Sequence, residues 1–229
     1  MIDIHAHVLS MVDDGSISNQ ASISMIEEAK NQGVTAMILT PHYRFENKKS
    51  VEQLKNAFDD FCALCQDKGV DLYLGQEIFY DGNCLSRVES GKNITLAQSK
   101  FVLLEFSPFE PIDIPEVVYE FVSAGFKPIV AHAERYLFLT ISDALEIKGL
   151  GGYIQVNAQS VAGESIRPVK KMAKKLLKNG VVDFIASDVH HNRKNYMQKA
   201  YNLIKKRYGE QTAERLFNQN ALQIIKGQA

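Results

Sequence analysis

Two histidines, His5 and His7, stand one residue apart in the opening segment MIDIHAH. Apolar Ile2, Ile4 and Ala6 alternate with polar residues there, and this period of two predicts a strand. Residues two apart on a strand point to the same side, about 6.6 Å from each other, so both imidazoles can bind one metal ion. The same pattern also fits two ordinary polar residues on an exposed strand, which is the commoner case for an isolated motif.

Other ligand-type residues follow the later predicted strands in the same way. Ligands bind at the carboxyl ends of the strands in parallel α/β folds, so these ends are where a site is expected. Six of the seven predicted strands deliver a His, Asp or Glu there, and none of the six histidines falls in a predicted helix. The residues concerned are His5, His7, Asp13, Asp14, His42, Glu77, Glu105, His132, Asp188, His190 and His191.

Imidazoles and carboxylates gathered at one rim are the ligands that divalent transition metals require. The candidates outnumber the four to six ligands of a single ion, so two or three ions are expected. Such clusters activate water near neutral pH and hold both the entering and the leaving oxygen of a phosphoryl transfer. The sequence therefore predicts a multinuclear metal site suited to phosphoester hydrolysis.

The elements that must position these residues alternate regularly between strand and helix. Glycines (Gly33, Gly69, Gly125 and Gly180) end four of the helical segments, as is typical of βα units. Seven strands separated by helices indicate a parallel sheet, and their number favours a (β/α) barrel over an open doubly wound sheet. The predicted strands are 1–5, 35–40, 71–76, 101–106, 128–131, 153–156 and 182–187. The predicted helices are 16–33, 51–69, 114–125, 142–148, 167–180, 196–208 and 212–226.

Composition is that of an ordinary globular protein, with 45% hydrophobic and 23% charged residues. Residues 1–115 carry 9 Lys and Arg against 17 Asp and Glu (−8), and residues 116–229 carry 17 against 10 (+7). The lysines between 170 and 178 are spaced as on the solvated face of a helix, which disfavours nucleic acid as a partner. No linker or repeat divides the chain, so we expect one domain, 1–229.

No run reaches the ~18 apolar residues of a membrane span. The first predicted strand starts at Met1, which leaves no room for a signal peptide, so a cytoplasmic protein is expected.

The motifs at the strand ends resemble those of the polymerase and histidinol phosphatase (PHP) superfamily. They are HxH at the N-terminus, TPH after the second strand, QE after the third, AHxER after the fifth and ASDxH after the seventh. The segments IDIHAHVLSMVDDG, GQEIFY, LLEF, PIVAHAER and YMQKAYNLIKKRYG narrow the resemblance to one branch. This branch comprises the bacterial metal-dependent protein-tyrosine phosphatases found beside capsule and exopolysaccharide synthesis genes.

The resemblance implies a distorted (β/α)7 barrel with three metal ions, usually Mn²⁺, with iron, zinc or magnesium as alternatives. It also implies that Arg135 and Arg193 contact the substrate phosphate. The segment HHNRKNYM, which contains Arg193, is shorter here than in the relatives. Glu105 stands where several other branches have histidine. The implied ligand sets are His5, His7, Glu77 and Asp188 for the first ion, Glu77, Glu105 and His132 for the second, and Asp14, His42 and His190 for the third.

The implied activity is phosphotyrosine hydrolysis by metal-activated hydroxide. The implied substrate is a tyrosine-phosphorylated protein, namely the C-terminal tail of an autophosphorylating kinase that regulates capsular or exopolysaccharide synthesis. One alternative is a histidinol-phosphate phosphatase, or another small-molecule phosphoesterase, that uses the same site. Another is a regulatory metal-binding module that has lost catalysis, although such remnants usually lack ligands and every expected position is filled here.

Cysteine chemistry is excluded by spacing. Cysteine-dependent tyrosine phosphatases use a Cys-x5-Arg loop, and none of Cys62, Cys65 and Cys84 is followed by arginine at that distance. The pair Cys62 and Cys65 lies in a helical pattern and is interpreted as core packing.

The sequence alone leaves two interpretations open for several neighbours of the candidate ligands. Asp13 could only shape the turn before Asp14, and Glu134 could support the site or lie on the surface. His191 is expected to point away from the site. Gln155 and Asn157 could line the pocket or satisfy backbone groups.

Overall fold

The computed structural model describes residues 1–44 and 49–227. Within them, parallel strands alternate with helices along the chain. The strands are β1 (Ile2–Ala6), β2 (Ala36–Leu39), β3 (His42–Tyr43), β4 (Asp71–Leu74), β5 (Glu77–Phe79), β6 (Phe101–Glu105), β7 (Lys127–Val130), β8 (Tyr153–Asn157) and β9 (Phe184–Ala186).

These strands form seven βα units that curl into a distorted barrel, as predicted. The sheet orders are β1-β2-β4 and β3-β5-β6-β7-β8-β9. Two residues separate β2 from β3 and β4 from β5, so each pair is one interrupted strand that runs from the first sheet into the second. The ends meet because Ala6 bridges Val189, just after β9, and the His7 N–H donates to the Val189 carbonyl at 3.0 Å.

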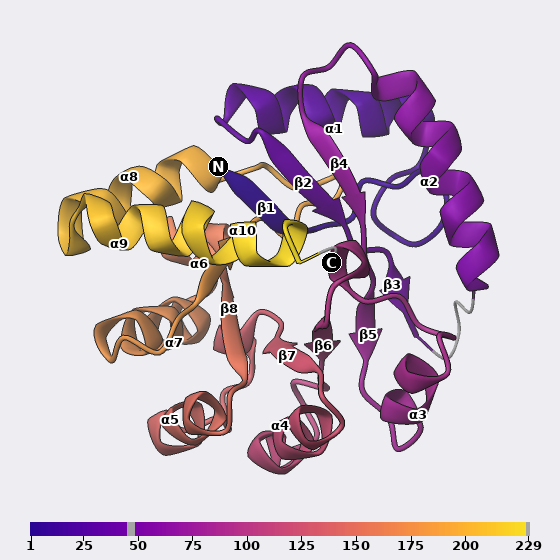
Figure 1. The fold of residues 1–229 in the computed structure, drawn as a ribbon. Coiled ribbons are helices and arrows are strands. Elements are labelled where there is room, and N and C mark those ends of the chain that lie inside the picture. The colour runs from indigo at the N-terminus through magenta and orange to yellow at the C-terminus, as the bar shows by residue number, and fades with distance from the viewer. Residues whose placement is uncertain (45–48, 228–229) are drawn as a thin grey trace.

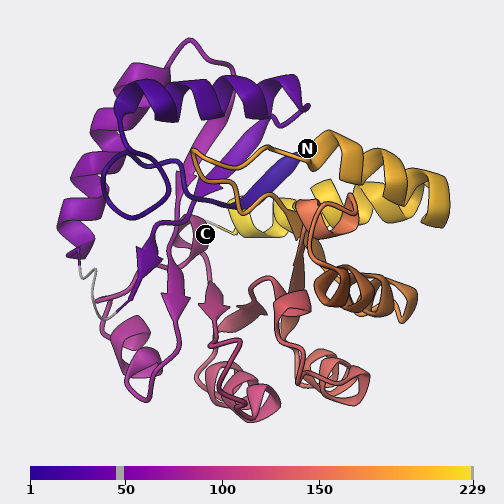
Figure 2. The same cartoon turned by 180° about the vertical axis from the view of Figure 1, so that it is seen from behind.

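Helices lie around the outside of the strands (Figures 1 and 2), with α1 and α2 beside the first sheet and α4, α5 and α7 beside the second. Serine or threonine caps begin three of them, and Ser50 and Thr140 form capping boxes with Gln53 and Asp143. The α-helices are α1 (Asn19–Asn31), α2 (Val51–Cys65), α3 (Cys84–Glu89), α4 (Ile114–Ser123), α5 (Ile141–Gly149), α6 (Ala158–Val161), α7 (Arg167–Lys178), α8 (Met197–Tyr208), α9 (Glu210–Glu214) and α10 (Asn220–Ile225).

Three further helical segments are η1 (Leu96–Gln98), η2 (Ala133–Arg135) and the π-helical η3 (Arg215–Gln219), which joins α9 to α10. The predicted 212–226 helix is therefore interrupted by a π turn. The short helices α3 and α6 were not predicted, because four to six residues carry no readable apolar period. No helix in the described part of the chain combines the length and apolarity that a membrane crossing needs.

The barrel is closed by apolar side chains at the amino ends of its strands. Ile2, Ala36 and Phe101 pack there in a buried cluster that also includes Leu96 of η1 and Ile224 of α10. A larger apolar cluster fills the space between the strands and the helices. Polar side chains are left to the carboxyl ends of the strands, where the candidate ligands lie.

Candidate metal centre

The nine candidate ligands come from six of the seven βα units and meet at one end of the barrel. Eight of them are buried, whereas the Asp14 side chain is 64% exposed. Nε2 of His5 lies 3.1 Å from Nε2 of His7, so the first strand directs both imidazoles to one point.

Glu77 stands at the middle of the cluster. Its Oε2 lies 3.3 Å from Nε2 of His5, 3.2 Å from Nε2 of His7 and 2.8 Å from Nδ1 of His42. Its Oε1 lies 2.7 Å from Nε2 of His132. One buried carboxylate therefore contacts four imidazoles through its two oxygens, which is the geometry of a bridging ligand.

Asp188 and Asp14 lie on two other sides of the imidazoles. Oδ1 of Asp188 lies 3.7 Å from Nε2 of His5 and 3.6 Å from Nε2 of His7. Oδ1 of Asp14 lies 3.5 Å from Nε2 of His42 and 3.7 Å from Nε2 of His190. The rings of His7 and His190 stack with centroids 4.3 Å apart.

Among the described residues, three overlapping groups of His, Asp and Glu side chains each have donor atoms that lie within 4.8 Å of one another. Because His7 belongs to two of these groups, the groups do not correspond to the three ligand sets that the resemblance implies. Asp188 and His132 fall outside these groups, although both contact members of them. The groups are His5, His7 and Glu77; His42, Glu77 and Glu105; and His7, Asp14, His42 and His190.

The residues fit a bound cation. Oε2 of Glu77 and Nδ1 of His42 are buried and 2.8 Å apart, yet among the described residues neither makes a hydrogen bond of favourable geometry. Buried polar atoms without partners are rare because they lose their hydration without compensation. A divalent cation would use both lone pairs, and carboxylate oxygen with imidazole nitrogen is a donor set that such ions accept.

The electrostatics keep Asp188 charged and two imidazoles neutral. Burial would raise the pKa of Asp188, but Arg135 and His5 outweigh it and hold that pKa far below its usual value. Burial and Arg135 lower the pKa of His132 to about 4, and burial and His7 lower the pKa of His190 to about 3. Neutral imidazoles offer a lone pair, so both side chains are ready to coordinate at neutral pH.

Residues behind the ligands orient the rings. Oδ2 of Asp13 lies 2.9 Å from Nδ1 of His7. Oε1 of Gln155 lies 3.2 Å from Nδ1 of His5 and accepts the N–H of His132 at 2.6 Å. Partners on Nδ1 leave Nε2 free to face the cluster, which is the usual support of metal-binding histidines. Asp13 therefore does more than shape a turn, and Gln155 satisfies both a ring and a backbone group.

Two candidate ligands have a left-handed backbone, which is uncommon outside glycine. φ is 32° at His132 and 50° at Asp188. The Asp188 N–H donates to the His5 carbonyl at 2.9 Å, and the preceding Ser187 N–H donates to Oδ1 of Asp3 at 2.9 Å. Surrounding hydrogen bonds thus hold a costly conformation at the site itself.

Arginines stand at the mouth of the cluster. Nη2 of Arg135 donates to Oδ2 of Asp188, and Nη1 of Arg193 lies 3.4 Å from the same oxygen. Their side chains remain 33% and 40% exposed, so both guanidinium groups also reach solvent.

A third arginine, Arg44, was not predicted. Its guanidinium donates to Glu105 through Nη2 at 2.8 Å to Oε1 and through Nε at 3.1 Å to Oε2. The sequence spacing could have indicated this contact, because Arg44 is two residues after His42 and residues at that spacing lie on the same side of a strand.

Two other neighbours lie outside the cluster. Nδ1 of His191 lies 2.9 Å from the Gly15 carbonyl oxygen. Glu134 is fully buried and accepts the Asn157 N–H at 3.0 Å and the Ser160 hydroxyl at 2.6 Å, so it is a structural carboxylate and not a surface charge.

The family model for capsular polysaccharide synthesis proteins CpsB/CapC matches residues 1–226. Tyrosine-protein phosphatase CpsB of Streptococcus pneumoniae is 33% identical over an alignment of 243 positions that covers 100% of this chain and 99% of that protein. Tyrosine-protein phosphatase YwqE of Bacillus subtilis is 28% identical, with 100% and 92% covered.

A solved structure from work on YwqE of Bacillus subtilis and CpsB of Streptococcus pneumoniae, described as unique metal-dependent tyrosine phosphatases, superposes with a TM-score of 0.91. It is 26% identical and the match covers 100% of this chain and 96% of that one. These matches confirm the resemblance noted from the motifs. The chain belongs to the CpsB/CapC family of capsular polysaccharide synthesis proteins.

Proposed function

We propose that this chain is a metal-dependent protein-tyrosine phosphatase, a phosphoric monoester hydrolase that acts within capsular or exopolysaccharide synthesis. The observation that carries the proposal is the contact of the Glu77 carboxylate with four imidazoles, beside two arginines at the open end of the cluster. Membership of a family whose relatives are named tyrosine-protein phosphatases supports it.

Three Mn²⁺ ions are proposed for the single domain 1–229, with iron, zinc or magnesium as alternatives. The overlap of the donor groups at Glu77 and His7 supports more than one ion. The proposed ligands are His5, His7, Glu77 and Asp188 for the first ion, Glu77, Glu105 and His132 for the second, and Asp14, His42 and His190 for the third.

When bound, divalent ions would supply the Lewis acidity that activates water and polarises a phosphate ester. Arg135 and Arg193 are proposed to bind the phosphate oxygens, because a planar guanidinium makes two parallel hydrogen bonds to an oxyanion. Both already direct N–H groups toward one carboxylate oxygen of Asp188. The phenolate of tyrosine has a pKa of about 10, so it leaves with less help from an acid than an alkoxide does.

The proposed substrate is a tyrosine-phosphorylated protein in the cytoplasm, specifically the C-terminal tail of an autophosphorylating bacterial tyrosine kinase. This identification rests on the family's association with capsule synthesis and on the names of the relatives.

The test compares hydrolysis of a phosphotyrosine peptide and of histidinol phosphate by the purified protein, together with an element-resolved metal count. We expect turnover of the peptide, loss of activity on chelation, recovery with Mn²⁺ and more than one ion per chain. Arg135→Lys is expected to raise KM for the peptide at least tenfold, since an ammonium cannot replace the fork of guanidinium N–H groups. Preferential turnover of histidinol phosphate would contradict the proposed substrate, and an active Asp188→Ala protein would contradict the metal assignment.

A further inference from the structure

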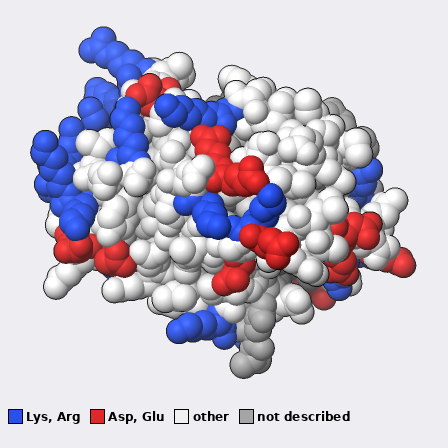
Figure 3. All heavy atoms as spheres, turned by 90° about the horizontal axis from the view of Figure 1, so that it is seen from above, with Lys and Arg blue, Asp and Glu red and all other residues white. Residues whose placement is uncertain are grey.

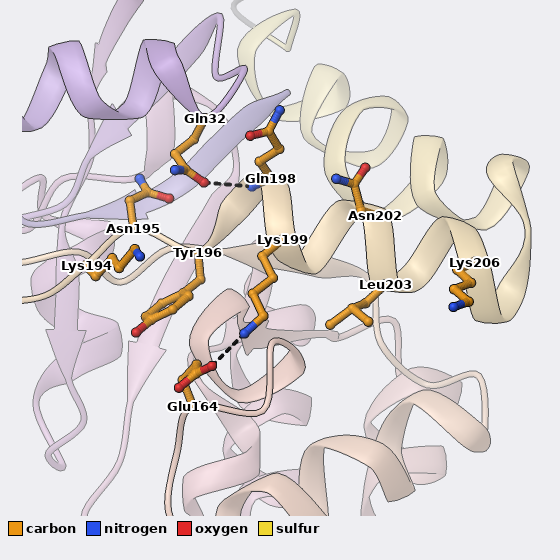
Figure 4. A pocket seen from close by; sticks show the side chains of 10 residues that line it. All are labelled: Gln32, Glu164, Lys194, Asn195, Tyr196, Gln198, Lys199, Asn202, Leu203 and Lys206. Atoms are coloured by element: carbon orange, nitrogen blue, oxygen red, sulfur yellow. Dashed lines mark hydrogen bonds and ion pairs between the residues drawn. The ribbon is translucent and has the colours of Figure 1, made fainter.

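A groove of about 640 Å³ runs beside α8. Its walls come from three segments: the end of α1 at Gln32, the loop after α6 at Glu164, and the chain from Lys194 through α8 to Lys206. Figure 4 shows these side chains standing around the hollow, with Lys199 reaching across it to Glu164.

The groove carries excess positive charge. Three lysines and one glutamate line it, and Nζ of Lys199 pairs with Glu164 at 2.5 Å. Among the described residues, Lys194 and Lys206 have no ion-pair partner. Nζ of Lys194 and Nζ of Lys199 each lie 5.9 Å from the centroid of the Tyr196 ring, so one aromatic side chain lies near two ammonium groups.

One face of α8 forms the length of this groove. Lys199, Asn202, Leu203 and Lys206 follow the spacing i, i+3, i+4 and i+7, which places them on one side of a helix. The face is about 10 Å long at 1.5 Å per residue, which equals about three residues of extended peptide. Figure 3 shows Lys and Arg gathered on the side of the molecule where α8 lies in Figure 1.

The groove begins next to the candidate metal centre. Lys194 directly follows Arg193, whose N–H donates to the His190 carbonyl at 2.9 Å. Two hydrogen bonds tie this wall to α1: the Asn195 N–H donates to Glu28 at 3.1 Å, and the Gln198 N–H donates to Gln32 at 3.2 Å. A chain with its phosphotyrosine between the arginines therefore has a preformed positive path along which to continue.

We propose that this groove binds an anionic stretch of the substrate polypeptide beside the phosphotyrosine, an inference that rests on the proposed function. The groups recognised are oxyanions, supplied either by Asp and Glu side chains or by a further phosphate. The face is short and net positive and contains one aromatic ring and one acid, which suits a few residues of peptide. It is too short and too mixed in charge to bind along a nucleic-acid backbone.

The experiment measures steady-state kinetics of the full-length Mn²⁺-loaded protein on four substrates. Three are phosphotyrosine peptides of equal length with flanking Glu, flanking Gln or a second phosphotyrosine, and the fourth is p-nitrophenyl phosphate. For the double variant Lys194→Gln/Lys206→Gln we expect KM to rise about fivefold for the anionic peptides, since two exposed ion pairs are lost. We expect changes below twofold for the Gln peptide and for p-nitrophenyl phosphate.

Two further variants sharpen the test. Glu164→Gln removes the acid of the groove, so KM for the anionic peptides is expected to fall about twofold. Lys171→Gln/Lys178→Gln makes the same change in charge on the exposed face of α7 and is expected to leave all four substrates unaffected. Comparison of the Glu and diphosphorylated peptides shows which oxyanion the groove prefers, and added salt should reduce either preference.

The outcomes separate this inference from the proposed function. Equal hydrolysis of all three peptides, or equal effects of the α8 and α7 variants, would contradict the proposal that the groove binds the substrate polypeptide. Neither result would contradict the phosphatase assignment. Lack of hydrolysis of every phosphotyrosine peptide would overturn both.

Discussion

Oδ2 of Asp13 lies 2.9 Å from Nδ1 of His7 and also accepts the backbone N–H of His42 at 2.9 Å. One carboxylate oxygen therefore ties together two candidate ligands that are 35 positions apart in the chain. Burial would raise the pKa of Asp13, but the hydrogen bond and charge of His7, together with the backbone hydrogen bonds from His42 and Gly15, outweigh burial and lower that pKa to about 2. Asp13 is consequently ionised at neutral pH and oriented toward the ring that it supports.

Asp13→Asn is expected to weaken Mn²⁺ binding by about 10- to 100-fold, because the amide cannot accept from both His7 and His42 through the same charged oxygen. The measurement is activity against Mn²⁺ concentration after chelation. Asp60→Asn, on the exposed side of α2, is the matched control. Equal half-saturating Mn²⁺ for the two variants would show that Asp13 does not support the ligands.

Removal of metal is expected to lower the melting temperature, because the buried carboxylates and imidazoles then lack the cations that they fit. Binding to the folded state alone contributes about 2.7 kcal/mol per site at a ligand concentration of 100 Kd. Thermal unfolding with chelator, and again after excess Mn²⁺, measures the difference. A melting temperature that chelation leaves unchanged would count against a buried multinuclear site.

Gly15→Ala is expected to lower the free energy of unfolding by about 3 kcal/mol and to displace His7. A Cβ at position 15 would lie 2.2 Å from the His7 carbonyl oxygen and 2.3 Å from its Cβ, and neither neighbour can retreat without moving β1. Gly82→Ala is the control, since a Cβ there meets nothing within 4 Å, and its change should stay within about 0.5 kcal/mol. Denaturant unfolding of both variants decides the comparison.

A variant without cysteine is expected to keep full activity. Cys65 and Cys84 are buried, and the three cysteines are free thiols in helices α2 and α3 and not at the strand ends. His5→Ala is the contrasting variant and should lose nearly all activity. Loss of activity in the triple Cys→Ala protein, with folding intact by circular dichroism, would point to a thiol nucleophile.

The buried thiol of Cys84 is expected to make the free energy of unfolding depend on pH. Burial raises the pKa of its thiol to about 12 from an ordinary value of 9.0. Between these pH values the unfolded chain releases a proton that the folded chain retains, so stability falls as pH rises, by at most about 1.4 kcal/mol per pH unit from this group. Cys84→Ala should flatten the decline between pH 9 and 11 in denaturant unfolding. An identical slope in wild type and variant would contradict a buried protonated thiol.

The repeating βα order was predictable from the chain because its signals are local. Apolar runs, polar caps such as Ser18 and Ser50, and glycines such as Gly33 and Gly125 act over a few neighbouring residues, and the seven predicted strands coincide with observed ones. The predicted strands end at residues 40 and 76, so the short strands β3 and β5, which follow the breaks at 40–41 and 75–76, were not predicted. Pro41 lacks an N–H for the ladder, which helps to explain the first break.

The types of the candidate ligands and their place at the strand ends were readable from the sequence by itself. Which atoms meet was decided by the tertiary structure: strand register sets His42 opposite Glu77, and a left-handed backbone turns Asp188 toward His5. The same register and loop conformations bring Arg44 to Glu105 and Asp13 to His7. Local preferences depend on adjacent residues, whereas a contact across tens of positions depends on how separate strands align, and that alignment is settled by packing of the whole barrel.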